Sequence, residues 1–118
     1  MMHEKSPEPR LRDIVGAIEH IRRKLEDISF ADFEGDLDRR RIVERCFEII
    51  SEASRRLPAD LKDRHPDIPW KKVAGIGNIL RHDYENVIPD ALWKFTRNDL
   101  APLERTCRAE LERYQTPD

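Results

Sequence analysis

The chain has 118 residues, of which 38% are hydrophobic and 39% are charged. This length fits one domain, and the 22 basic and 24 acidic residues leave a net charge of -2. Bulk attraction to nucleic acid is thereby excluded, so RNA binding would need a local basic patch. No apolar run approaches the roughly 20 residues of a membrane span, and the first ten residues lack the apolar core of a signal peptide. We therefore expect a soluble, cytoplasmic protein that makes no membrane contact.

The first strong signal is a long amphipathic helix. Residues 1–9 contain two prolines and are expected to form a flexible tail, followed by a single domain over residues 10–115. Apolar residues then recur at steps of three and four, as on one face of a helix: Leu11, Ile14, Val15, Ile18, Ile21, Leu25 and Ile28. The segment "SFADFEGD" interrupts this pattern, and Asp36 or Asp38 is expected to cap the next helix.

The remaining segments also show helical spacing. A second helix carries apolar residues from Ile42 to Leu57 and is expected to end at Pro58, after which "PADLKDRHPDIP" allows at most one helical turn. Pro69 suits the first turn of a third helix, which reaches residue 82 or 83. "DALWKFTRNDL" predicts a fourth helix, and the segment after Pro102 predicts a fifth. No segment alternates like a strand, so the fold class is all-α, an antiparallel bundle of four to five helices.

Several residues that could carry chemistry have simpler interpretations. Cys46 and Cys107 stand alone and are interpreted as small buried residues in a reducing compartment. The four histidines are scattered without metal-ligand spacing, so we expect neither a metal nor another cofactor. Ser51 has no nearby histidine and no nucleophile elbow, which argues against a serine nucleophile. Trp70 and Trp93 are interpreted as core anchors and not as base-stacking platforms.

The densest polar run is "GIGNILRHDYENV", residues 75–87. On a helix, Gly77 falls on the side that packs against the bundle, together with Val73, Ile76 and Leu80. Asn78 and His82 face away from this side. By spacing alone, an exposed helix end is the simpler interpretation, because His and Arg are favourable near a helix C-terminus. A functional site is the alternative.

The longer segment "IPWKKVAGIGNILRHDYENV" resembles the signature of HEPN-domain proteins of the HepT type, in which a tryptophan is followed by R-N-x-x-x-H-x-Y. Upstream, "EIISEASRRLP" is similar to the family's I-G-E-A segment before a proline. The resemblance continues downstream through "LWKFTRNDLAPL" and covers most of residues 10–114.

This resemblance implies a HEPN-like helical domain that acts as a metal-independent endoribonuclease toxin, a homodimer with two His motifs facing across a cleft. It also implies an mRNA or tRNA substrate and a type VII-like pairing with a minimal nucleotidyltransferase antitoxin. His82 would take the acid–base role and Asn78 would orient the phosphate or the histidine. Tyr84 would support the site and accept AMP groups from the antitoxin, and Glu52 would support the site from the second helix. If His82 and Tyr84 share a site, the helix must end near residues 82–83.

One departure from the family pattern bears on activity. Gly77 stands where the family has arginine, but Arg81 follows one turn later on nearly the same face. Helical side chains lean toward the N-terminus, so Arg81 would cover the surface above Gly77 and its guanidinium could replace the missing one. The alternative is an inactive HEPN module that only pairs with a nucleotidyltransferase or binds a nucleotide. A purely structural helical bundle is the third interpretation.

Overall fold

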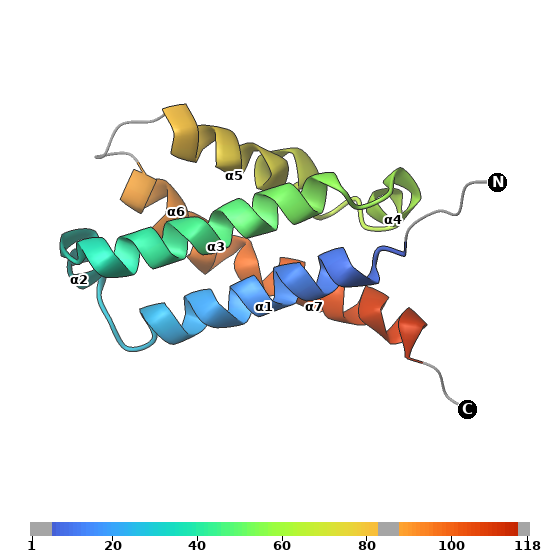
Figure 1. The fold of residues 1–118 in the computed structure, drawn as a ribbon, viewed down its shortest axis with the longest axis horizontal. Coiled ribbons are helices and arrows are strands. Elements are labelled where there is room, and N and C mark those ends of the chain that lie inside the picture. The colour runs from blue at the N-terminus through green and yellow to red at the C-terminus, as the bar shows by residue number, and fades with distance from the viewer. Residues whose placement is uncertain (1–5, 83–87, 116–118) are drawn as a thin grey trace.

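A computed structural model describes residues 6–82 and 88–115, and the regular structure within these ranges is entirely helical (Figure 1). The described elements are α1 (Glu8–Leu25), α2 (Phe30–Gly35), α3 (Leu37–Arg55), α4 (Ala59–Asp63), α5 (Trp70–His82), α6 (Ile88–Asn98), α7 (Leu100–Leu111) and a final 3-10 turn, η1 (Glu112–Tyr114). The predicted all-α fold is confirmed. No helix in the described part of the chain is long and apolar enough to cross a membrane.

The two longest helices, α1 and α3, pack against each other and form the centre of the bundle (Figure 1). On its other side α3 packs against α5, while α1 packs against α7, and α6 contacts both α7 and α2. Helix α3 therefore connects the main body of the bundle to α5, the helix that contains most of the polar run.

The core follows from the helical spacing of the apolar residues. In α1, Leu11, Ile14, Ile18 and Ile21 are fully buried. They are met by apolar residues of α3, including Phe47, whose ring lies edge-on to that of Phe95 in α6 with centroids 5.5 Å apart. Truncating such a buried aromatic to alanine typically costs about 3–5 kcal/mol, so this layer is a main source of stability.

Helix α2 was not predicted, because its six residues are too few to display a helical period. Its local signal is a capping box, in which the Ser29 hydroxyl accepts the Asp32 N–H and the Asp32 carboxylate accepts the Ser29 N–H. Phe33 then buries its ring, 1% exposed, beside Trp93. Capping and one buried aromatic are thus enough to form a short helix.

The other helix boundaries largely follow the sequence signals. Asp36 caps α3 as predicted, because its Oδ1 accepts the Arg39 N–H at 3.0 Å. Helix α3 ends at Arg55, three residues before the predicted stop at Pro58. The single turn allowed after Pro58 is α4.

Both cysteines are buried, as predicted, Cys46 in α3 and Cys107 in α7. Burial raises the pKa of the Cys46 thiol above its usual value. The same desolvation, with smaller effects of Glu110 and Glu104, raises the pKa of Cys107 to about 12.

Candidate functional site

Helix α5 divides its side chains between core and solvent as its spacing predicts. Val73, Ile76 and Gly77 are buried. Asn78, Arg81 and His82 are exposed, and at about 100° per residue they lie within an arc of roughly 100° on one side of the helix. The other residue expected here, Tyr84, lies outside the described residues.

The buried side of α5 makes a close contact with α3 at Gly77. Ser51 of α3 is 1% exposed and its hydroxyl bridges two backbone atoms of α5. It donates to the Ala74 carbonyl at 2.6 Å and accepts the Gly77 N–H at 3.1 Å. A Cβ added to Gly77 would lie only 3.0 Å from Ser51 Oγ. The two helices therefore touch where residue 77 has no side chain.

The guanidinium of Arg81 lies over this same position. Its Nη1 is 3.4 Å from the point that a Cβ on residue 77 would occupy. This placement follows from the lean of helical side chains toward the N-terminus, which brings a residue over the one that lies a turn before it. A guanidinium is thus present beside residue 77, although residue 77 is a glycine.

Glu52 points along its own helix. It accepts a hydrogen bond from Arg56 at 3.0 Å and lies 3.9 Å from Arg55. Within the described residues no hydrogen bond or ion pair joins Glu52 to α5. Its neighbour Arg55 does reach α5, where its Nη2 donates to the Ala74 carbonyl at 2.9 Å.

Sequence reasoning overlooked Ser51 and Arg55 as contacts of α5. Both belong to the segment "EIISEASRRLP" that carries part of the family resemblance. That position in the chain was the only signal that pointed to them.

The start of α5 is fixed by a buried carboxylate. Glu110 of α7 has a side chain only 3% exposed and binds Arg64 at 2.9 Å and His65 Nε2 at 2.6 Å. Trp70 begins α5, and its indole N–H donates to the carbonyls of His65 and Lys62 at 3.0 and 3.2 Å. These bonds attach the loop before α5 to α7.

The pKa of Glu110 reflects two opposed effects. Burial on its own would raise the pKa, but hydrogen bonds from Arg64 and His65 and the charges of Arg64 and Arg113 outweigh it. The pKa therefore lies below its usual value, so the carboxylate is ionised at neutral pH and can hold its partners.

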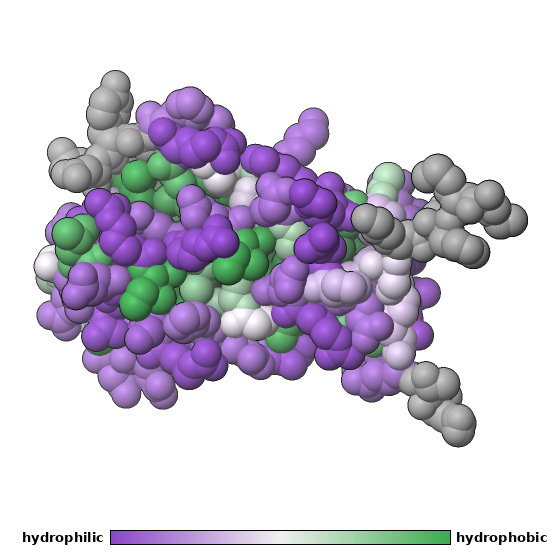
Figure 2. All heavy atoms as spheres, in the orientation of Figure 1, coloured by the Kyte–Doolittle hydropathy of each residue, from purple (hydrophilic) through white to green (hydrophobic). Residues whose placement is uncertain are grey.

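The surface around α5 is mostly polar but also exposes some apolar side chains. Figure 2 shows hydrophobic atoms among hydrophilic ones over α3 and near the C-terminal end of α5. The large hydrophobic side chains that are most exposed in the described chain belong to these two helices: Leu37 of α3 is 53% exposed and Ile79 of α5 is 36% exposed. Ile79 is next to Asn78, so apolar surface adjoins the exposed polar residues of α5.

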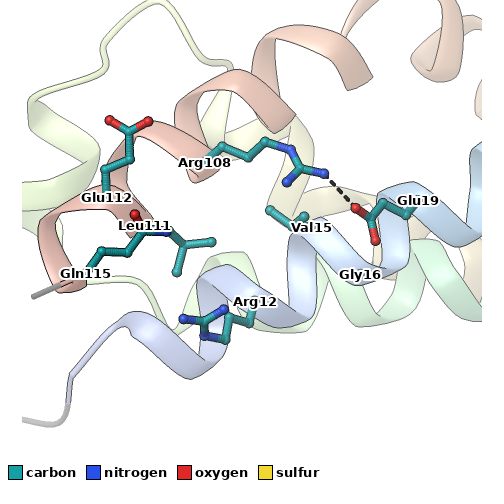
Figure 3. A pocket seen from close by; sticks show the side chains of 8 residues that line it. All are labelled: Arg12, Val15, Gly16, Glu19, Arg108, Leu111, Glu112 and Gln115. Atoms are coloured by element: carbon teal, nitrogen blue, oxygen red, sulfur yellow. Dashed lines mark hydrogen bonds and ion pairs between the residues drawn. The ribbon is translucent and has the colours of Figure 1, made fainter.

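Elsewhere, a groove of about 470 Å³ lies between α1 and the segment formed by the end of α7 and η1 (Figure 3). Arg108 crosses it to bind Glu19 at 2.6 Å, and Val15 and Leu111 form its apolar part. None of the exposed α5 residues line it. In the described part of the chain, no three His, Cys, Asp or Glu side chains gather in a way that could hold a metal ion.

Comparisons with known proteins agree on one family. A family model described as "Ribonuclease HepT-like" matches residues 14–110. A "Probable ribonuclease HepT" from Thermococcus cleftensis is 39% identical over 101 residues, which cover 86% of this chain and 92% of the relative. A "Putative RNase" from Caldanaerobacter subterraneus is 32% identical over 109 residues, which cover 92% of this chain and 97% of the relative. Another "Putative RNase", from Methanocaldococcus jannaschii, is 31% identical over 104 residues, which cover 88% of this chain and 95% of the relative. No solved structure gives a significant match.

Proposed function

Because the chain belongs to the HepT-like ribonuclease family, we propose that it is a metal-independent endoribonuclease whose site contains His82, Arg81 and Asn78. The observation that carries this proposal is the guanidinium of Arg81 over Gly77, on the helix whose exposed side also presents Asn78 and His82. An arginine beside the histidine is what the family pattern requires, and here it comes from a different position.

These residue types suit cleavage of RNA by its own 2′-hydroxyl. The 2′ oxygen forms a bond to the neighbouring phosphorus while the bond from phosphorus to the 5′ oxygen breaks. One group must take the 2′ proton and another must give a proton to the leaving 5′ oxygen. Histidine can perform either step near neutral pH. A guanidinium can hold the phosphate and stabilise its developing charge, and Asn78 can orient the phosphate or His82.

The acting unit in this proposal is a homodimer in which two copies of His82 face a shared groove. One His82 would then act as the base and the other as the acid. Two observations support this arrangement: Asn78 and His82 point away from their own core, and Ile79 exposes apolar surface beside them. Burying Ile79 against a second copy would remove that surface from water.

In the cell, we place the protein in a toxin–antitoxin pair with a minimal nucleotidyltransferase and with mRNA or tRNA as substrate. Tyr84 is the proposed acceptor of AMP, and an added AMP two residues after His82 would obstruct the site. Glu52 is assigned a supporting role from α3 through Arg55, which lies 3.9 Å from Glu52 and itself donates to the Ala74 carbonyl of α5. These assignments extend the family resemblance to individual residues.

The test is RNA cleavage by purified protein in the presence of EDTA. Wild type should cleave, His82→Ala should lose at least about a hundredfold in rate, and His20→Ala on α1 should match wild type. Expression of wild type should arrest growth, and His82→Ala should relieve the arrest. Equal cleavage by wild type and His82→Ala would contradict the proposed site.

A binding-only module remains the second candidate, and the specific observation that favours it is Gly77 at the family's arginine position. Under this alternative the wild type binds RNA or a nucleotide but leaves RNA intact. Fluorescence anisotropy with a 2′-deoxy-substituted oligonucleotide, beside the cleavage assay, separates the two functions.

A further inference from the structure

Ser51 occupies an unusual position for a helical serine. Buried serines in helices commonly bond to their own helix, as Ser54 does here by donating to the Ser51 carbonyl at 2.8 Å. The Ser51 hydroxyl instead reaches the neighbouring helix and bonds both Ala74 and Gly77. The hydroxyl donates in the first bond and accepts in the second, so its proton and one of its lone pairs are both engaged by α5. Sliding or rotating α5 would break both.

The same hydroxyl leaves little room for a side chain at position 77. A Cβ there would lie 3.0 Å from Ser51 Oγ and 3.6 Å from Ser51 Cβ, so the close contact is with the oxygen. The space next to this contact is taken by the Arg81 guanidinium. The two departures from the family's motifs, serine for glycine at position 51 and glycine for arginine at position 77, therefore fall on residues that touch.

We propose that Ser51 is a positioning residue for Arg81: its hydroxyl fixes α5 against α3 and keeps position 77 free, so that the guanidinium of Arg81, the exposed residue next to His82 in the chain, lies across Gly77. Its effect on cleavage rests on the proposed ribonuclease function, whereas the contact with Gly77 can be tested without activity. The substitutions at positions 51 and 77 are then one coupled exchange and not two separate losses.

The contact is tested by thermal unfolding of four proteins: wild type, Ser51→Ala, Gly77→Ala and the double variant. Alanine is a better helix former than glycine, so Gly77→Ala should raise the Tm once the Ser51 oxygen is removed. With Ser51 present it should lower the Tm. Gly75→Ala is the matched control, because a Cβ at Gly75 meets nothing within 4 Å. Its effect should not depend on residue 51. An equal effect of Gly77→Ala in both backgrounds overturns the contact.

The positioning role is tested by cleavage rates. Ser51→Ala should lower kcat by about tenfold with little change in KM, as expected for a displaced catalytic group. Ser54→Ala, which removes a buried hydroxyl that serves only α3, should stay within about twofold of wild type. In an Arg81→Ala background, Ser51→Ala should cause no further loss, because the group that it positions is gone. A loss of the same size with and without Arg81, or no loss at all, overturns the role.

If the wild type cleaves no RNA, the proposed function fails and the same cycle is measured on binding. The probe is a 2′-deoxy-substituted oligonucleotide followed by fluorescence anisotropy. Ser51→Ala should weaken its binding only when Arg81 is present, and an Arg81-independent effect overturns the positioning role. A wild type that neither cleaves nor binds overturns it as well, and the unfolding cycle then decides the Ser51–Gly77 contact by itself.

Discussion

Arg81 reaches the surface above Gly77 because a long side chain on a helix leans back by about one turn. Gly77 contributes no atoms there, and Arg81 Nη1 comes within 3.4 Å of the point where its Cβ would be. Among the described residues, no carboxylate forms an ion pair with this guanidinium. At the scale of single residues, the proposed site thus depends on the long side chain of Arg81 and on the absence of a side chain at Gly77.

Arg81→Ala should weaken RNA cleavage by about a hundredfold or more, the usual cost of removing one preorganised charge-stabilising donor. Arg81→Lys should restore only part of the rate, because a point charge cannot reproduce the planar fork on phosphate. The free energy of unfolding should change by no more than about 0.5 kcal/mol, since the side chain is exposed. Lys71→Ala, an exposed cation on the same helix, is the control for loss of charge alone. Arg81→Ala that cleaves like wild type would refute the role.

An arginine restored at position 77 should recover RNA cleavage only when residue 51 is changed as well. In an Arg81→Ala background, Gly77→Arg places a Cβ 3.0 Å from Ser51 Oγ and should recover little activity. Adding Ser51→Gly removes that oxygen and should bring cleavage back to within about tenfold of wild type. The added glycine costs about 1 kcal/mol of helix stability, so assays belong well below the Tm. Recovery with Ser51 still in place would show that the site adapts around the serine.

Tyr84→Phe should keep the fold and remove the proposed site of AMP transfer, because the phenol hydroxyl is the only group deleted. Intact-mass measurement after co-expression with a minimal nucleotidyltransferase of the proposed antitoxin type should show AMP adducts on wild type and none on Tyr84→Phe. Tyr114→Phe, near the C-terminal end, is the matched control and should carry the same adducts as wild type. An equal number of adducts on Tyr84→Phe would show that another residue is modified.

At the scale of elements, α5 is held at its start by a carboxylate from another helix. Glu110 of α7 binds Arg64 and His65 in the loop before α5, and Trp70 bonds the carbonyl of His65. The position of the exposed polar residues on α5 therefore depends on α7 as well as on α3.

Glu110→Gln should lower the free energy of unfolding at pH 7 by about 1–2 kcal/mol, which corresponds to a Tm about 5 °C lower. The folded pKa of Glu110 is below its usual value, so its stabilisation is complete above the unfolded pKa of about 4.3 and is lost as pH falls through the folded pKa. The Tm difference from wild type should therefore shrink below about pH 4. Glu112 is an exposed carboxylate two residues after Glu110, and Glu112→Gln should change the Tm little at any pH. A difference for Glu110→Gln that is constant from pH 7 to pH 3 would contradict this origin.

Which elements could be predicted from sequence depended on their length. Helices α1 and α3 repeat their apolar spacing over several turns, so their existence and buried faces followed from the pattern. Helix α2 has too few residues for a period and needed its capping box to be recognised. The contact of Ser51 with Gly77 joins residues 26 positions apart on two helices, so no local pattern could reveal it. The exposed side of α5 was predictable, while its partners on α3 required the packing.

At the scale of the whole molecule, a thin core leaves apolar surface on α3 and α5. The chain is 39% charged, yet Leu37 and Ile79 remain exposed on these helices. A second copy covering α5 would complete the burial and bring two exposed polar faces together.

The expected state is a homodimer with twice the 14.0 kDa chain mass, measured by light scattering after size exclusion at micromolar concentration. Ile79→Glu should shift the protein to monomer and abolish cleavage, because a buried, unpaired charge at an interface costs several kcal/mol. Ala109→Glu, exposed on α7, should leave both the dimer and cleavage unchanged. A wild type that stays monomeric, or an Ile79→Glu variant that stays dimeric, would count against an interface at α5.

The buried cysteines make the protein suitable for site-directed labelling. A thiol reacts as its thiolate, and with the pKa of Cys107 at about 12, fewer than about one in ten thousand of these side chains is ionised near pH 7.5. Cys46 is 3% exposed and its pKa is also raised. A single cysteine introduced at the exposed Lys71 should therefore react with a maleimide or nitroxide reagent while both native thiols remain in place. One substitution would then put a pair of probes on α5 of two associated copies, and the distance between the probes would report how the two helices face each other.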